Sequence, residues 1–258
     1  MKVVRTVIVL DRGDVMNSAE WARTHEQYTA AIKSMVHPPD ATKFILRKKT
    51  PKLNKGGRKT SQWNRNGVSP IKQLFLSEME KRSWKREEPL SLKEVAGKYA
   101  AEAEEFFLEY PSKKPITEPL HSLVGDLDCH FTISKEWRAA IEWETGNISS
   151  SHRSMNKLCL GLMAGQVEVA VLIVPSREMY PHLTDRIGNW LELSPYLHFW
   201  KKAGQFVKRG LLAITVVEHD ELTDNPAVPY FATGGDGNSA RGLAKTKKIA
   251  AYPKKRGR

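Results

Sequence analysis

Apolar residues in the first half of the chain recur at helical spacing. Asn17 and Glu20 stand three residues apart, which is the spacing of a helix N-terminal capping box. The apolar stripe that follows consists of Trp21, Tyr28, Ile32 and Met35. Because the residue before a proline disfavours helical backbone, we expect this first helix to stop at the His37-Pro38-Pro39 step.

Two further helices are predicted before residue 111. One begins at Pro70, since proline is tolerated at the first helical position, and runs to about Arg86. Its inward-facing residues are Ile71, Leu74, Phe75 and Trp84. The other covers residues 92–110, and residues 111–119 form a connector. The segment 48–66 contains Pro51, Gly56 and Gly57 and is expected to be an exposed loop.

The second half of the chain alternates between apolar runs of strand length and a helical segment. We predict strands over residues 131–134, 139–145, 167–174 and 211–217, and a helix over 149–163 that closes at Gly165. The run 167–174 is β-branched and continuously apolar, as expected of a strand covered on both faces. The pattern therefore predicts an α/β fold with a central mixed β-sheet flanked by helices. We expect a single domain over residues 1–258.

The net charge of +12 is concentrated in two segments. Residues 47–65 form a basic loop with eight Lys or Arg, and residues 241–258 form a basic C-terminal tail with another eight; neither contains an acid. In the rest of the chain, acidic residues outnumber basic ones. Such segments attract polyanions, because each neutralised phosphate releases condensed counterions. Together they favour a nucleic-acid partner, although either one alone would also fit a solvated loop or tail.

Several classes of protein are disfavoured. Cys129 and Cys159 lack a CxxC spacing, which argues against a disulfide framework or a zinc site and fits a reducing cytoplasm. The longest apolar stretches are far too short to cross a bilayer, so no membrane association is expected. The segment Gly234-Gly235-Asp236-Gly237 lacks the Gly-Lys-Ser/Thr ending of a phosphate-binding loop, so no nucleotide cofactor is expected.

Three acidic residues form a candidate catalytic cluster: Asp128, Glu142 and Glu144. Residues two apart on a strand face the same side, so Glu142 and Glu144 should point together while Ile141 and Trp143 point into the core. Neighbouring carboxylates repel one another, and a divalent cation that prefers hard oxygen ligands, such as Mg²⁺, resolves the conflict. Glu-x-Glu spacing alone more often marks the polar face of an exposed strand, which is the alternative.

The residues around this cluster resemble one nuclease family. The run from Ile141 to Ser150 (IEWETGNISS), continued by residues 152–158 (HRSMNKL), resembles the BamHI family of restriction endonucleases, in the PD-(D/E)xK nuclease superfamily. Further matching stretches are residues 66–72 (NGVSPIK), 84–90 (WKREEPL), 183–186 (LTDR) and 235–237 (GDG). The resemblance implies a restriction-endonuclease-like α/β core.

The resemblance also implies a magnesium-dependent catalytic centre. The implied metal ligands and catalytic residues are Asp128, Glu142, Glu144 and Glu87, together with the main-chain carbonyl of Trp143. Asp126 is a rival for Asp128, two residues earlier on the same strand face, and Asp128 is preferred because it fits the family pattern best. Glu144 stands where most of the superfamily has Lys, and it would orient or deprotonate the attacking water.

Base recognition in the major groove is implied in the same way. The helix predicted near Ser149 would direct its positive N-terminal end at DNA. The Asp185-Arg186 pair is chemically suited, because Arg grips guanine O6 and N7 while Asp accepts from the cytosine amino group; a buried ion pair is the alternative. The implied DNA-binding residues are Lys72, Asn147, Ser149, Arg153, Asp185, Arg186, Asp236 and Asn238.

These features predict a type II restriction endonuclease, located in the cytoplasm of a prokaryotic cell. It would use Mg²⁺ to hydrolyse both strands of double-stranded DNA at a palindrome centred on GATC, with GGATCC as the leading site, and would leave 5'-phosphate ends. The alternatives are a non-cleaving DNA-binding protein on the same fold and a nuclease that acts on RNA or structured DNA.

A palindromic site favours a homodimer, because a twofold axis places one catalytic centre on each strand. The helix predicted from residue 149 carries an apolar stripe that either packs against its mate in the dimer or faces the core of its own chain. The stripe consists of Met155, Leu158, Cys159 and Leu162.

Overall fold

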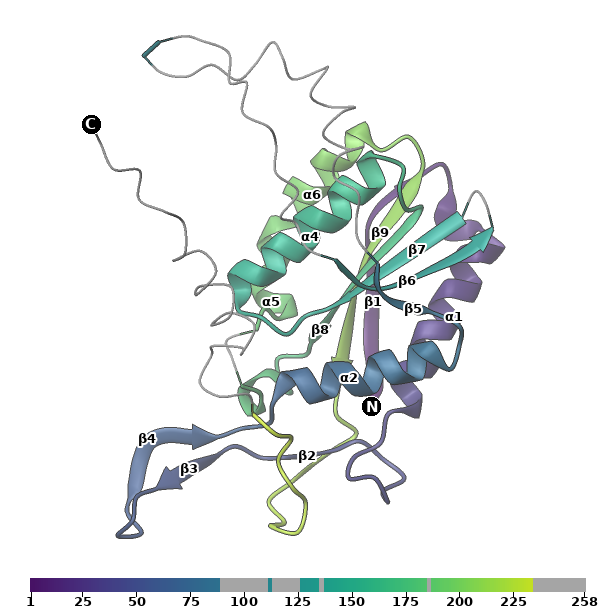
Figure 1. Cartoon of the computed structure of the whole chain (residues 1–258). Coiled ribbons are helices and arrows are strands. Elements are labelled where there is room, and N and C mark those ends of the chain that lie inside the picture. Colours follow the sequence, from purple (N-terminus) through teal and green to yellow (C-terminus); the bar gives the residue numbers. More distant parts are fainter. Residues whose placement is uncertain (89–110, 113–125, 135–136, 185–186, 234–258) are drawn as a thin grey trace, which may run out of the picture.

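Six strands form a central mixed sheet in the order β1-β9-β8-β7-β6-β5. The computed structural model describes residues 1–88, 111–112, 126–134, 137–184 and 187–233 (Figure 1). The strands are β1 (Lys2–Arg12), β5 (Lys85–Glu88), β6 (Leu127–Ser134), β7 (Trp137–Trp143), β8 (Val169–Pro175) and β9 (Gly210–Glu218). β7, β8 and β9 run parallel, and β1, β6 and β5 add antiparallel neighbours at the two sides. This confirms the α/β class with a mixed sheet.

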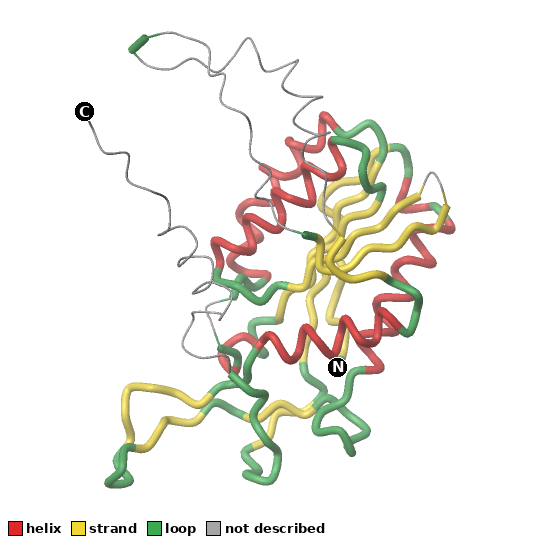
Figure 2. Tube along the Cα trace, in the orientation of Figure 1, coloured by secondary structure: helices red, strands yellow, loops and turns green. Residues whose placement is uncertain are grey.

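Helices cover both faces of the sheet (Figure 2). α1 (Ala19–Ser34) and α2 (Val68–Glu80) contribute to one hydrophobic cluster. α4 (Ile148–Met163), α5 (Trp190–Leu193) and α6 (Leu197–Ala203) contribute to a second cluster on the other face. Every residue of β8 is buried, because this strand lies at the centre of the sheet between the two layers. Four short 3-10 helices are η1 (Val15–Asn17), η2 (Tyr180–His182), η3 (Ser194–Tyr196) and η4 (Gly204–Phe206).

The first helix agrees with its prediction, and the second is shorter than predicted. Ser18 rather than Asn17 caps α1, since its side chain accepts a hydrogen bond from the Trp21 N–H. α2 ends at Glu80, whereas the apolar spacing predicted a helix to about Arg86. Ser83 takes a left-handed backbone conformation with φ of 67°, which no helix continues, and the chain then enters β5. Trp84 is buried as expected, but it lies after the end of the helix.

The basic segment 47–65 is a hairpin rather than the predicted loop. Its strands are β3 (Thr50–Leu53) and β4 (Lys59–Asn64), and it extends away from the sheet (Figure 1). Asn54 Oδ1 accepts hydrogen bonds from the N–H groups of Gly56 and Arg58, and Gly57 has φ of 73°. These local interactions explain why residues 54–58 form a tight turn that joins the two strands. At its base, β2 (Ile45–Arg47) pairs with β10 (Glu221–Thr223).

Several expectations fall outside the described residues: the helix over 92–110, most of the connector 111–119 and the basic tail 241–258. In the part of the chain that is described, no helix is both long and apolar enough to cross a membrane. Cys129 and Cys159 are buried free thiols. The single-domain organisation over residues 1–258 stays a prediction.

Candidate active site

Two carboxylates from neighbouring strands meet where β6 begins and β7 ends. Asp128 lies on β6 and Glu142 on β7, and the ladder register places them opposite each other, next to the Cys129–Ile141 pair. The Asp128 N–H donates to Glu142 Oε1 at 3.1 Å, and the Trp143 N–H donates to Asp128 Oδ2 at 2.8 Å. The two side chains are therefore held by each other's main chain.

The alternation of β7 has the predicted direction. Ile141 and Trp143 point into the cluster beneath α1 and α2, where Trp143 packs on Phe75 with ring centroids 4.8 Å apart. Glu142 points to the opposite face, which α4 covers, and only 5% of it is exposed. The alternative of a solvent-exposed polar face is therefore wrong: a carboxylate buried in this way must have partners.

A lysine from each helical layer compensates the carboxylates. Lys72 of α2 forms an ion pair with Asp128. Lys157 of α4 lies 2.8 Å from Glu142 Oε1, with both side chains less than a tenth exposed, and it also donates to the main-chain carbonyl of Asp126 at 2.8 Å. Lys72 thus lies with the carboxylates, and its predicted contact with DNA stays a prediction.

The environments of the two glutamates favour protonation. Burial, and then the charge of Asp128, raise the pKa of Glu142 to about 7, against the opposing effect of Lys157. Burial also raises the pKa of Glu144, and the hydrogen bond from the Gly146 N–H to its Oε1, 2.6 Å long, opposes this. The buried Oε2 of Glu144 has no hydrogen-bond partner in the described structure. The Ser151 hydroxyl also lowers the pKa of Glu144 by hydrogen bonding, so α4 contributes to the environment of this carboxylate.

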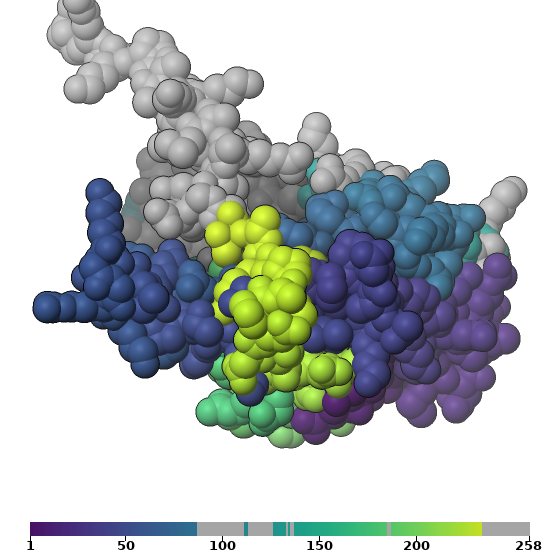
Figure 3. Space-filling model, turned by 90° about the horizontal axis from the view of Figure 1, so that it is seen from below, coloured from purple at the N-terminus to yellow at the C-terminus, as the bar shows by residue number. Residues whose placement is uncertain are grey.

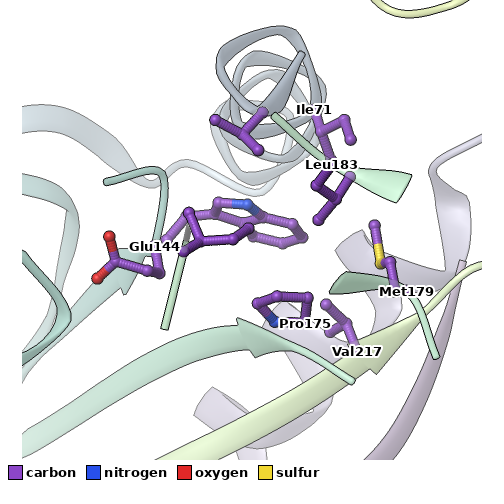
Figure 4. A pocket seen from close by; sticks show the side chains of 9 residues that line it. Ile71, Glu144, Pro175, Met179, Leu183 and Val217 are labelled. Atoms are coloured by element: carbon purple, nitrogen blue, oxygen red, sulfur yellow. The ribbon is translucent and has the colours of Figure 1, made fainter. Parts of the chain in front are cut away.

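A small apolar pocket lies beside Glu144, beneath α2 (Figure 4). Figure 4 shows the Glu144 carboxylate pointing away from Met179, Leu183 and Val217, which lie on the far side of the pocket. The lining residues are Val68, Ile71, Trp143, Glu144, Pro175, Met179, Leu183, Ile187 and Val217. This wall removes water from one side of Glu144, which accounts for the raised pKa.

Asp128 is better placed than its rival Asp126 to bind a cation. Asp126 is exposed and precedes β6, whereas the Asp128 carboxylate is largely buried and lies next to Glu142. Glu87, on β5, stands opposite Asp128 in the register, between the pairs Arg86–Cys129 and Glu88–Leu127. The structure describes the main chain of Glu87 but not its side chain.

The donor set fits Mg²⁺. Among the described residues, no three Asp, Glu, His or Cys side chains converge as a preformed metal cluster. Mg²⁺ does not require three protein side chains, because it is commonly held by one or two carboxylates while waters and substrate phosphate complete its coordination shell. Asp128 and Glu142 supply that pair of hard oxygen donors, and a cation held there would share their oxygens with Lys72 and Lys157, which are paired with them in the described structure.

The N-terminus of α4 is exposed close to this centre. Asn147 caps the helix by accepting from the Ser150 N–H at 3.2 Å, and Ser149 and Arg153 are exposed one turn apart on α4. Gly188 packs tightly here, since a Cβ at this position would lie 2.1 Å from Ser151 Oγ. The other candidate DNA contacts lie outside the described residues: Asp185, Arg186, Asp236 and Asn238.

The apolar stripe on α4 faces the protein's own core. All four of its residues are buried in the cluster that α4 forms with the sheet: Met155, Leu158, Cys159 and Leu162. The hypothesis that this stripe packs against a second copy is therefore wrong, and the intramolecular alternative holds.

Lys157 is the site residue that sequence reasoning missed. It lies four residues after Arg153, which itself lies four residues after Ser149, so the three follow one row of the helix. The row begins at the exposed N-terminal end and reaches Glu142 in the interior. The sequence did contain a signal for this residue: Lys157 is a lysine among the apolar residues on the buried face of the helix.

A mixed sheet with helices on both faces, which holds paired acidic side chains beside the N-terminus of a helix, defines a nuclease of the restriction-endonuclease type. The chain matches the family model described as restriction endonuclease BamHI over residues 1–238, and it belongs to that family. It is therefore a type II site-specific deoxyribonuclease.

Two relatives and one solved structure show the extent of the likeness. The type II restriction enzyme OkrAI of Oceanobacter kriegii is 31% identical over 241 residues, which is 93% of this chain and 100% of OkrAI. The type II restriction enzyme BamHI of Bacillus amyloliquefaciens is 34% identical over 188 residues, 71% of this chain and 73% of BamHI. The crystal structure of restriction endonuclease BglII complexed with a DNA 16-mer has a similar fold, with a TM-score of 0.54, 10% identity and coverage of 93% and 88%.

Proposed function

We propose that this restriction endonuclease uses Mg²⁺ to cut both strands of GGATCC and leaves 5'-phosphate ends, acting as a homodimer in the prokaryotic cytoplasm. The observation that carries the catalytic part is the buried Asp128–Glu142 pair, with its two lysines, beside the exposed N-terminus of α4. The family relationship supports the choice of site, and the BglII structure, which is a complex with DNA, is in keeping with a DNA partner.

The chain's own residues divide the chemistry between them. Asp128 and Glu142, with the main-chain carbonyl of Trp143, would hold the metal, and Glu87 would add a further carboxylate. When bound, Mg²⁺ lowers the pKa of water and stabilises charge on the phosphoryl and leaving oxygens. Glu144 would orient the attacking water and accept its proton, a role that the raised pKa of this buried carboxyl supports.

Recognition is assigned to the surface around the N-terminus of α4. A half-site of GGATCC presents two guanines and an adenine, which call for donors to O6 and N7, acceptors for cytosine amino groups and an amide for adenine. The chain offers these groups in Asn147, Ser149, Arg153, Asp185, Arg186, Asp236 and Asn238. Asn147 uses its side-chain oxygen as a helix cap, so its amide N–H group remains the part that can donate to DNA.

The experiment is digestion of a plasmid that carries one GGATCC site, with Mg²⁺ and with Mg²⁺ plus EDTA. We expect linear product only without EDTA, and the ends should religate with DNA ligase because they carry 5'-phosphates. Specific binding without any cleavage under these conditions would instead identify a non-cleaving DNA-binding protein.

The basic hairpin β3–β4 is assigned to phosphate contacts, as is the tail 241–258. Lys52, Lys55, Arg58 and Lys59 are all exposed on the hairpin. We expect their joint replacement by Ala to weaken binding of GGATCC and random DNA by the same factor. The salt dependence of the binding constant should flatten by about 0.9 for each phosphate that the variant no longer neutralises.

Fluorescence anisotropy in Ca²⁺ at several salt concentrations measures this effect, and removal of residues 252–258 should act in the same direction. Arg23→Ala with Lys33→Ala, exposed on α1, is the matched control and should leave binding unchanged. A change in the sequence cut, at unaltered affinity, would contradict the assignment.

The dimer is assigned to the surface of α5 and α6 instead of the α4 stripe. Of eight large apolar side chains exposed in the described residues, four belong to this short stretch: Leu191, Tyr196, Phe199 and Phe206. An exposed apolar patch of this kind marks an interaction surface.

We expect the wild-type chain to sediment as a dimer and Phe199→Glu to sediment as a monomer, since a charge would be buried at the contact. Leu53→Glu is the matched control, because Leu53 is as exposed as Phe199 but lies on the hairpin. A wild-type monomer, both free and on GGATCC duplex, would rule out the dimer.

A further inference from the structure

Asn66 is a completely buried polar residue that joins three segments distant in the sequence. Its side-chain amide donates to the carbonyl of Arg47 at 2.8 Å and to that of His182 at 3.0 Å. Its side-chain oxygen accepts from the Phe231 N–H at 3.4 Å. Its own N–H donates to the His182 carbonyl at 2.9 Å, and its carbonyl accepts from the Thr184 N–H at 2.8 Å. Every polar group of the residue is therefore used.

Each of the three segments leads into residues assigned to DNA. Arg47 opens the basic hairpin, Thr184 directly precedes Asp185-Arg186, and the segment around Phe231 directly precedes Gly234-Gly235-Asp236. Figure 3 shows the yellow segment that ends near residue 233 lying against the blue hairpin region. Two bonds of Tyr230 support this contact: its hydroxyl donates to the Lys48 carbonyl at 2.6 Å and lies 3.0 Å from Thr50 Oγ1.

We call Asn66 and its hydrogen-bond partners at Arg47, His182, Thr184 and Phe231 the hub. The hub is also connected to the catalytic centre. Gly67 donates its N–H to the Phe231 carbonyl at 3.1 Å and is the N-cap residue of α2, the helix whose Lys72 pairs with Asp128. Only a glycine fits here, since a Cβ on residue 67 would lie 1.9 Å from the Ala232 carbonyl oxygen. Asn66 and Gly67 therefore connect the segments that precede the candidate base-reading residues to α2, the helix that contacts Asp128 through Lys72.

We infer that Asn66 is a positioning residue for sequence discrimination: its hydrogen bonds hold the segments ending at Thr184 and Ala232 in the register that lets the following residues read bases. This inference rests on the proposed function. Loss of the hub should therefore affect the preference for the cognate site more than it affects binding to DNA as such, because the basic hairpin keeps its own β3–β4 ladder and the β2–β10 pairing at its base.

The test compares wild type, Asn66→Ala and Gly67→Ala. For each protein, kcat/KM is measured on a GGATCC duplex and on duplexes with one base pair changed, and Kd is measured on random duplex in Ca²⁺. We expect discrimination to fall about tenfold or more, as when one good base contact is removed, while the Kd for random DNA changes by about twofold or less. Gly67→Ala displaces the 231–233 segment without removing a hydrogen-bonding side chain, so it tests the same point independently of Asn66.

Tyr28→Phe is the matched control for stability. It removes a buried hydroxyl that lies 2.9 Å from Thr215 Oγ1, between α1 and β9, so it should lower the Tm without changing discrimination. Hydrogen exchange gives a readout besides activity: in Asn66→Ala the amides of Gly67, Thr184 and Phe231 should lose protection while those of β8 keep it.

The possible results distinguish failure of the proposed function from failure of the role inferred for Asn66. A wild-type protein that cuts without preference overturns the proposed function, and the inference with it. A wild-type protein that discriminates, together with Asn66 and Gly67 variants that keep its ratio, overturns the inference alone. An equal loss of discrimination in Tyr28→Phe would show that general destabilisation, not the hub, is responsible.

Discussion

Replacing Glu142 by Gln should lower the cleavage rate by roughly three orders of magnitude or more, as is typical when one member of a catalytic unit is removed. The amide has nearly the same shape but can no longer supply a charged oxygen to Mg²⁺. Asp128→Asn and Glu144→Gln should cause losses of the same order. Single-turnover cleavage of a GGATCC duplex measures the effect, and binding in Ca²⁺ should persist in all three variants.

Asp126→Asn is the matched control for this series. Asp126 lies two residues before Asp128, but its side chain is exposed and only its main-chain carbonyl takes part in the site. We expect this variant to cleave at close to the wild-type rate. Full activity of Glu142→Gln, or equal losses in Asp126→Asn and Asp128→Asn, would show that the cation is held elsewhere.

Lys157→Met should destabilise the metal-free protein by about 3–5 kcal/mol, the usual effect of removing one partner from a buried ion pair. Both members of the pair are less than a tenth exposed, and the Lys157 ammonium also bonds to the Asp126 carbonyl. Protonation of the remaining Glu142 will limit the loss, since its pKa is already raised to about 7. Urea unfolding in EDTA, at one protein concentration, measures the difference.

The double variant Glu142→Gln with Lys157→Met tests whether the buried ion pair causes this loss of stability. If the pair is the reason for the loss, removing both charges should recover much of the stability, because no unpaired charge then remains buried. Strict additivity of the two single variants would contradict the buried pair. Arg23→Met, on the exposed surface of α1, should leave the unfolding midpoint unchanged.

Much of the framework could be predicted from the sequence where one pattern admits one structure. The apolar β-branched run that became β8 fits a strand covered on both faces, and the stripe of α1 begins three residues after its capping residue. The helix end before Ser83 could not be predicted, because the apolar spacing continues to Trp84 and a serine rarely takes the left-handed backbone conformation found at residue 83.

The sequence singled out Asp128, Glu142 and Glu144 through the family resemblance rather than through their spacing, and their catalytic roles stay a prediction. It gave no comparable indication for Lys157, because a lysine on a helix usually indicates solvent. That Lys157 reaches Glu142 follows from the packing of α4 on the sheet. The stripe that begins at Met155 illustrates the same limit: periodicity identifies the buried face of a helix but not the surface that buries it.

The most direct test of the proposed activity is sequencing of the ends produced when genomic DNA is digested with the wild-type protein and Mg²⁺. We expect the ends to map to GGATCC on both strands and to carry 5'-phosphates, and we expect EDTA to abolish them. Cuts at sites that lack a central GATC, or cuts that persist in EDTA, would contradict the proposal.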